Sequence, residues 1–137
     1  MNCELCNILS NEQFRIVFEN EHAFVVVILE PIKDGHLMVM PKRHAEELSD
    51  LTPEEAQSFL MAADNCLHGL ENYQKESTLF TVNGKKNRSQ KHLHAHVVPS
   101  RHAIRELFAL AEGTPERQRA NDKELQKMAD DLRPFIS

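Results

Sequence analysis

The chain has 137 residues, of which 41% are hydrophobic and 27% are charged. This size and composition fit one globular domain with its own core and argue against wholesale disorder. The formal net charge of −5 argues against a protein that binds nucleic acid through a broad basic surface. An odd number of cysteines, three, excludes a framework built from disulfides alone.

The N-terminal residues lack the basic start and long apolar stretch of a secretory signal. Apolar runs along the chain also fall well short of the roughly 20 residues that span a bilayer. We therefore expect a cytoplasmic protein in a reducing compartment, without a membrane or a nucleic acid as its partner.

The first part of the chain predicts a short helical turn followed by three strands. Residues 3–9 fit the helical turn, and residues 14–19 alternate loosely as a strand does. The apolar run from Ala23 to Leu29 is rich in β-branched residues, and its continuity is typical of a strand buried on both faces. A third strand is predicted at residues 36–40, before Pro41.

A clear helix start follows at Thr52. Thr52 suits the N-cap, Pro53 the first helical position, and Glu55 completes a capping box. Apolar residues then recur at spacings of three and four, which predicts an amphipathic helix that ends near Asn72. They are Ala56, Phe59, Leu60, Ala63, Leu67 and Leu70.

The second part of the chain predicts two more strands and two tail helices. The strands are expected at residues 79–83 and 92–98, and the helices at residues 101–111 and from residue 114 onward. Short connections between strands, with one long helix inserted, indicate an α+β fold rather than a doubly wound parallel one. We expect an antiparallel sheet of about five strands with helices packed on it.

Residues 92–98 carry histidine at every second position. In a strand, His92, His94 and His96 share one face, and the apolar residues between them share the other. Imidazole can act near pH 7 as an acid, a base, a nucleophile or a metal ligand. The row therefore predicts a site with chemistry; a pure metal site and a half-exposed strand that carries histidine by chance are the alternatives.

The pattern His-x-His-x-His-x-x, with apolar residues at x, resembles the histidine triad (HIT) family of nucleotide hydrolases and transferases. Two further segments precede this pattern in the order that the family has. Gly35-His36 begins a strand that ends in Pro41-Lys42-Arg43-His44, and the polar loop from Asn83 to Gln90 is similar to the family's phosphate loop.

The resemblance also implies a domain organisation and an assembly. It covers about residues 3–100, so we expect a single HIT-like domain over residues 1–137 in which residues 101–137 form a helical C-terminal extension. Because HIT proteins of this size form two-fold homodimers, it implies a homodimer with the helix at residues 52–72 as a candidate interface. A monomer whose helix only covers the sheet is the alternative.

The mechanism implied by the resemblance is covalent. The middle imidazole, His94, attacks the α-phosphate of a nucleotide, and water or another acceptor resolves the nucleotidyl-histidine. His96 and His36 then stabilise charge or protonate the leaving group. Expected substrates are phosphoramidates or dinucleoside polyphosphates. A nucleotide- or metal-binding module with little turnover is the alternative.

The loop at residues 83–91 suits a phosphate because it offers amide and hydroxyl donors and four cations. Asn83 and Ser89 align with the family's phosphate-contacting positions. The loop is shorter and less glycine-rich than is usual in the family, so we expect fewer backbone contacts to phosphate. A solvated hairpin loop is the alternative.

Recognition of the nucleoside departs from the family's pattern at one position. By resemblance, Leu5, Ile8 and Ile28 line the base pocket, although core packing explains them equally well. The family usually carries an Asp that binds the ribose eight residues before the histidine of Gly-His, and this chain has Ile28 there. Glu30 faces the same way if the strand continues, which makes it a candidate substitute.

The pair Cys3-x-x-Cys6 has the spacing of metal ligands. Several bacterial-type HIT proteins hold a structural zinc with such a pair, and the resemblance implies a site made of Cys3, Cys6, His44 and His92. Two cysteines and two histidines form a closed tetrahedral set, as expected for a structural ion. Free thiols and a redox pair are the alternatives.

Overall fold

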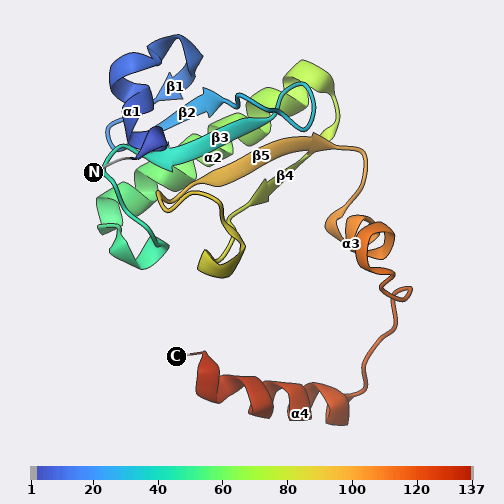
Figure 1. Ribbon diagram of the computed structural model, residues 1–137. Coiled ribbons are helices and arrows are strands. Elements are labelled where there is room, and N and C mark those ends of the chain that lie inside the picture. The colour runs from blue at the N-terminus through green and yellow to red at the C-terminus, as the bar shows by residue number, and fades with distance from the viewer. Residues whose placement is uncertain (1–2, 137) are drawn as a thin grey trace. The chain divides into compact units, whose positions relative to one another are not determined.

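The computed structural model describes residues 3–136, and the chain divides after Ala103 into two units. Five antiparallel strands form the centre of the first unit in the order β1-β2-β3-β5-β4 (Figure 1). The strands are β1 (Ile16–Glu19), β2 (Ala23–Val27), β3 (Leu37–Pro41), β4 (Ser77–Thr81) and β5 (Ala95–Ser100). The predicted α+β class with a five-stranded antiparallel sheet is confirmed.

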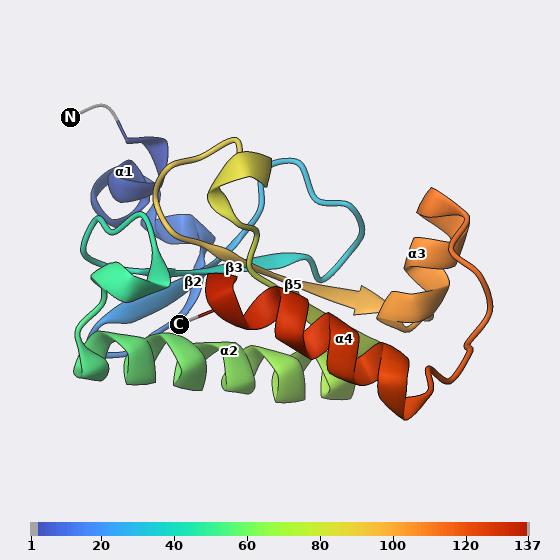
Figure 2. The same ribbon diagram turned by 90° about the horizontal axis from the view of Figure 1, so that it is seen from below.

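Helix α2 (Pro53–Gln74) covers one face of the sheet (Figure 2). Its start is the predicted capping box, in which the Glu55 N–H donates to the Thr52 hydroxyl and the Thr52 N–H donates to the Glu55 carboxylate. The buried stripe differs in part from the prediction, because Leu60 is 57% exposed. Its apolar members are Phe59, Ala62, Ala63, Cys66 and Leu70.

Helix α1 (Glu4–Asn11) packs on the opposite face. It contributes Leu5 and Ile8 to a second apolar cluster with Phe24, Val26, Met38 and Met40. Successive residues of β2 therefore enter different clusters, Val25 beneath α2 and Val26 beneath α1. This two-sided burial explains the unbroken apolar run. The predicted burial on both faces is confirmed up to Val26, and the strand itself ends at the exposed Val27.

The strand register fixes the face on which the histidines lie. Residues directly opposite in an antiparallel pair share a face. Val26 pairs with Met38, and Met38 pairs with His96, so His96 lies on the α1 face. Val39 pairs with Ala95 in the row that faces α2. The sheet thus presents His96 on the face opposite α2.

Two strand boundaries differ from the prediction. β4 begins and ends two residues earlier, and β5 begins only at Ala95, so that His92 and His94 precede it. β5 also continues through Pro99, where a stop was expected. It pairs with β3 only as far as Val97, so beyond that point the missing N–H of Pro99 faces no β3 partner.

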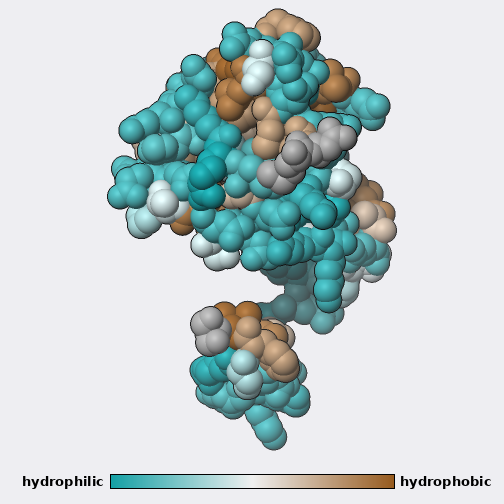
Figure 3. Space-filling view, turned by 60° about the vertical axis from the view of Figure 1, so that its left-hand side comes forward, coloured by the Kyte–Doolittle hydropathy of each residue, from teal (hydrophilic) through white to brown (hydrophobic). Residues whose placement is uncertain are grey.

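The second unit consists of helices α3 (Ile104–Glu112) and α4 (Asp122–Leu132). The predicted start of the last helix at residue 114 is wrong, because residues 113–121 are not helical and few apolar residues follow residue 114. The observed start is a capping box of Asn121 and Glu124, directly before the apolar residues of α4. Figure 3 shows apolar side chains gathered on one side of this helix. Within residues 3–136, no helix is long and apolar enough to cross a membrane.

Candidate active site and metal centre

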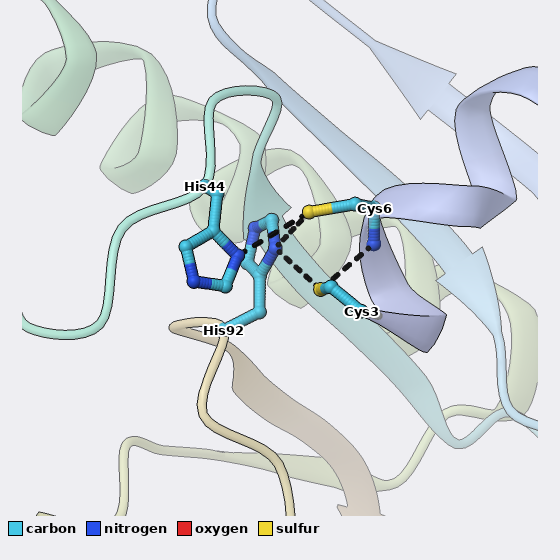
Figure 4. A group of neighbouring side chains, drawn as sticks. All are labelled: Cys3, Cys6, His44 and His92. Atoms are coloured by element: carbon cyan, nitrogen blue, oxygen red, sulfur yellow. Dashed lines mark hydrogen bonds between the residues drawn. The ribbon is translucent and has the colours of Figure 1, made fainter. Parts of the chain in front are cut away.

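Four predicted metal ligands come together from three separate segments (Figure 4). Cys3 is the N-cap of α1, and its sulfur accepts the N–H of Cys6 at 3.2 Å, so one helical turn presents both sulfurs. His44 follows β3, and His92 precedes β5. One ligand atom of each residue lies within 4.8 Å of all the others.

Three distances within the group are close to those between the ligands of a tetrahedral ion. His92 Nδ1 lies 3.2 Å from the Cys6 sulfur and 3.5 Å from the Cys3 sulfur, and His44 Nδ1 lies 3.3 Å from the Cys6 sulfur. A tetrahedron with usual zinc bond lengths has edges of roughly 3.3–3.8 Å. His92 Nε2 donates to the Pro41 carbonyl at 2.9 Å, which leaves Nδ1 of the neutral ring free to bind a cation.

Burial, with a hydrogen bond to Cys3, raises the pKa of the Cys6 thiol to about 11. A bound cation acts in the opposite direction, because the thiolate is the ligand. The four residues can therefore hold a metal ion, which would release protons when it binds.

His94 is held in a defined tautomer by the backbone. Its Nδ1 donates to the carbonyl of His92 at 2.9 Å, and the side chain is buried. Because a carbonyl oxygen can only accept, Nδ1 carries the proton and Nε2 of the neutral ring has its lone pair available. This is the state that a nucleophilic imidazole requires.

A chain of hydrogen bonds also sets the tautomers of His36 and His96. The backbone N–H of Ile32 donates to His36 Nδ1 at 3.1 Å, so the proton of the neutral His36 ring is on Nε2. That nitrogen lies 2.9 Å from His96 Nδ1 and donates to it. The proton of His96 is consequently on Nε2, which makes this atom a hydrogen-bond donor.

Electrostatics keep these two rings neutral near pH 7. Burial, followed by the charge of His96, lowers the pKa of His36. Burial, followed by the charge of His94, lowers the pKa of His96. The rings of His94 and His96 meet edge-on with centroids 5.2 Å apart. The site thus places the His94 ring, whose Nε2 is available, edge-on to the His96 ring, which carries an N–H donor.

The polar loop is braced by its own cations. Lys85 Nζ lies 3.0 Å from a carboxylate oxygen of Glu47, and Arg88 donates to the carbonyl of Glu46 at 2.6 Å. Asn83 donates to the Asn87 carbonyl at 3.1 Å. An open pocket of about 350 Å³ lies between this loop and residues 46–49, and Leu93 also lines it. Two of the four cations therefore hold the loop in place.

Comparison with known proteins decides the family. The family model described as the HIT domain matches residues 10–103. The chain belongs to the HIT family. A curated relative, bis(5'-adenosyl)-triphosphatase of Dictyostelium discoideum, is 30% identical over an aligned length of 134 residues, and the alignment covers 90% of this chain and 87% of the relative.

Further HIT proteins agree in sequence or in fold. The nitrilase and fragile histidine triad fusion protein NitFhit of Caenorhabditis elegans is 31% identical over 83% of this chain, but the chain spans only 28% of that longer protein. A crystal structure of a HIT family member from Bacillus subtilis superimposes with a TM-score of 0.72 at 20% identity. It covers 100% of this chain and 99% of the other. At this identity the likeness shows the fold.

The departure from the HIT pattern at Ile28 is clearer in the structure. β2 ends at Val27, so Ile28 lies just outside the strand, half-buried against the cluster that contains Leu5 and Ile8. The structure thus brings together the three residues expected at the base pocket. The strand does not continue to Glu30, which is exposed before Pro31, so the condition for its role as a substitute is not met.

Sequence reasoning missed the backbone partners of the histidines. These are the N–H of Ile32 and the carbonyls of Pro41 and His92. Every residue carries such groups, so composition and spacing do not distinguish them. The sequence carries one local signal, the glycine at position 35, which indicates a turn directly before His36. In the structure Gly35 has a φ of +87°, a conformation that glycine adopts readily.

Proposed function

We propose that this HIT protein is a nucleotide-phosphate hydrolase or nucleotidyl transferase that works through a covalent nucleotidyl-histidine on His94. The observation that carries the proposal is the tautomer of His94, whose Nδ1–H is held by the His92 carbonyl while Nε2 is available. The neutral N–H donor of His96 beside it provides the second group that the reaction needs.

In the first step, His94 Nε2 attacks the α-phosphorus, a P–N bond forms, and the bond to the leaving group breaks with its electron pair. His96 Nε2–H donates a hydrogen bond to the oxygen on which negative charge develops. The His92 carbonyl stabilises the positive charge that arises on the His94 ring. Water then attacks the same phosphorus, and the P–N electron pair returns to Nε2 while the water proton leaves to solvent.

The proposed substrates are dinucleoside polyphosphates or nucleoside phosphoramidates. The name of the Dictyostelium relative, bis(5'-adenosyl)-triphosphatase, supports the first class. Asn83 and Ser89 are proposed phosphate contacts, since both are exposed on the loop before the triad. Leu5, Ile8 and Ile28 form the proposed apolar surface for the base.

A substrate panel tests this proposal. Purified protein is incubated with diadenosine triphosphate or adenosine phosphoramidate, and the products are separated by chromatography. We expect release of AMP by the wild type and none by His94→Ala. Tight binding of both compounds without turnover by the wild type would overturn the proposal in favour of a nucleotide-binding module. Ile28 at the ribose position is the feature that favours this second reading.

For the metal site, we propose that the resident ion is zinc. The Cys₂His₂ donor set, with the His92 ring oriented by the Pro41 carbonyl, supports a closed structural site. When bound, such an ion supplies folding free energy rather than a reacting group. Its place in the reaction is indirect, because His92 offers its ring to the metal group and its carbonyl to His94.

We further propose a cytoplasmic homodimer with one HIT domain and a helical C-terminal extension at residues 101–137. Three large side chains of α2 are exposed and support an interface there, Leu60, Met61 and Tyr73. The thiols of Cys3 and Cys6 must stay reduced to bind a metal, which supports a reducing compartment.

A further inference from the structure

The turn that carries His36 also controls its tautomer. The Lys33 carbonyl accepts the N–H of His36 at 3.2 Å, and Gly35 closes the turn with a φ of +87°. The same turn brings the N–H of Ile32 to His36 Nδ1. The conformation of residues 32–36 therefore decides which nitrogen of His36 carries the proton.

The end of α2 holds this turn through hydrogen bonds. Gln74 is the last residue of the helix, and its amide Nε2 donates to the Asp34 carbonyl at 2.8 Å and lies 3.3 Å from the Asp34 carboxylate. The Tyr73 hydroxyl donates to that carboxylate at 3.3 Å. Two consecutive residues of α2 thus bind one residue at the centre of the turn.

Close packing leaves the turn little freedom. A Cβ at Gly35 would lie 2.9 Å from Gln74 Nε2, which is closer than real Cβ contacts, and 3.0 Å from Pro99 Cγ, which is tighter than most of them. On the other side, Lys33 pairs with Glu76 at 2.9 Å. The turn is consequently fixed between the end of α2, the start of β4 and the end of β5.

We propose that Gln74 is a positioning residue for the reaction of the triad, acting through the turn on His36. This inference rests on the proposed function for its catalytic consequence, but not for its structural one. Gln74 holds the Asp34 carbonyl, the turn keeps the Ile32 N–H on His36 Nδ1, and His36 Nε2–H then donates to His96.

The loss of Gln74 has a definite chemical consequence. Without the Ile32 N–H on Nδ1, His36 also adopts the tautomer with its proton on that nitrogen. Its Nε2 then faces His96 Nδ1 with two lone pairs opposed, and His96 responds by moving its own proton to Nδ1. His96 Nε2 thereby loses the proton with which it would stabilise the developing charge.

The substitution Gln74→Glu tests this, because it keeps the shape of the side chain but replaces its donor with an acceptor against the Asp34 carboxylate. Gln57→Glu is the matched control, since it makes the same change on the exposed side of α2. Long-range ¹⁵N–¹H NMR spectra report the tautomers of His36 and His96 in the full chain without substrate.

We expect protons on Nε2 of both rings in the wild type and in Gln57→Glu, and a mixture of tautomers in Gln74→Glu. We also expect kcat of Gln74→Glu to fall in proportion to the productive tautomer that is lost, by no more than about 100-fold, the lower end of a general acid–base contribution, with KM unchanged. Unchanged tautomers in Gln74→Glu would overturn the inference, whatever happens to kcat.

The NMR result separates this inference from the proposed function. Mixed tautomers in a protein whose wild type hydrolyses no nucleotide would refute the proposed function and leave the control of the turn by Gln74 standing. If Gln74→Glu does not fold, Gln74→Met removes the donor without adding charge and is expected to give the same mixture. Wild-type tautomers in a folded Gln74→Met would overturn the inference.

Discussion

His92 and His94 lie two residues apart in the chain, yet the structure prepares them for opposite tasks. The backbone holds Nε2 of His92, at the Pro41 carbonyl, and therefore leaves Nδ1 for the cysteines. It holds Nδ1 of His94, at the His92 carbonyl, and therefore leaves Nε2 for an electrophile. The role of each imidazole follows from the nitrogen that its backbone partner occupies, rather than from the residue type.

The sharpest way to break this comparison is to remove the proposed nucleophile. His94→Ala is expected to lower kcat by at least about 10³-fold, because the covalent route disappears with the ring. The measurement is the steady-state hydrolysis of the substrate found in the panel. Binding of nucleotide should persist, since the loop and the apolar surface are unchanged. Wild-type turnover by His94→Ala would contradict the assignment.

His96→Ala is expected to have a smaller effect, on the order of 10²-fold in kcat, because this ring donates a hydrogen bond but forms no bond to phosphorus. Rate measurements under the same conditions as for His94→Ala check the difference. An equal loss for both variants would indicate that the two rings act as one unit.

In the comparison, the metal group that contains His92 is expected to affect the stability of the protein. Cys3→Ser or His44→Ala is expected to lower both the metal content, from about one ion per chain, and the melting temperature, by on the order of 10 °C, because metal binding contributes folding free energy. Elemental analysis and calorimetry measure the two quantities. Cys66→Ser is a control that should keep the metal, since Cys66 packs in the α2 cluster. Full metal content in a Cys3→Ser/Cys6→Ser double variant would refute the site.

The pH dependence is a milder test. The pKa values of His36 and His96 are lowered, chiefly by burial, so both rings stay neutral below the ordinary value of about 6.5. We expect kcat to stay level as the pH falls to about 6.5 and to decline only below it. The free energy of unfolding falls over the same acid range, since the unfolded chain takes up these protons first. A decline in kcat centred above the ordinary value would contradict the neutral state.

The smallest expected effect concerns the sugar. With Ile28 packed beside Leu5 and Ile8 and Glu30 outside the strand, we expect substrates with ribose and with 2'-deoxyribose to have similar kcat/KM. Competition between the two sugars measures the ratio directly. Ile28→Asp is expected to create a preference for ribose. A strong preference for ribose in the wild type would mean that another group reads the hydroxyls.

Much of this fold could be predicted because its signals are local. The capping box at Thr52 and Glu55 and the apolar run of β2 depend on neighbours in the chain. The boundaries of β5 could not be predicted, because pairing with β3 and β4 decides where that strand begins and ends. The start of α4 differs from the prediction for another reason: a capping signal needs apolar residues at helical spacing after it, and these follow Asn121 rather than residue 114.

The candidate site could also be predicted only in part. Its side chains could be named from spacing and resemblance, and the structure brings the four proposed metal ligands into one group and His36 to His96. The tautomers could not be predicted, because they depend on the backbone groups that the folded loops present. Gly35 signals the turn before His36, but the attachment of this turn to Gln74 was likewise invisible in the sequence.

The most direct test of the account is to trap the proposed intermediate. Wild-type protein is mixed with diadenosine triphosphate, denatured within the first turnover and digested, and the peptides are analysed by mass spectrometry under conditions that preserve phosphorus–nitrogen bonds. We predict an adenylyl group on His94, absent from His94→Ala and present in His92→Ala that still folds. An adenylyl group on another residue, or turnover by the wild type without any adduct, would contradict the assignment of His94 as the nucleophile.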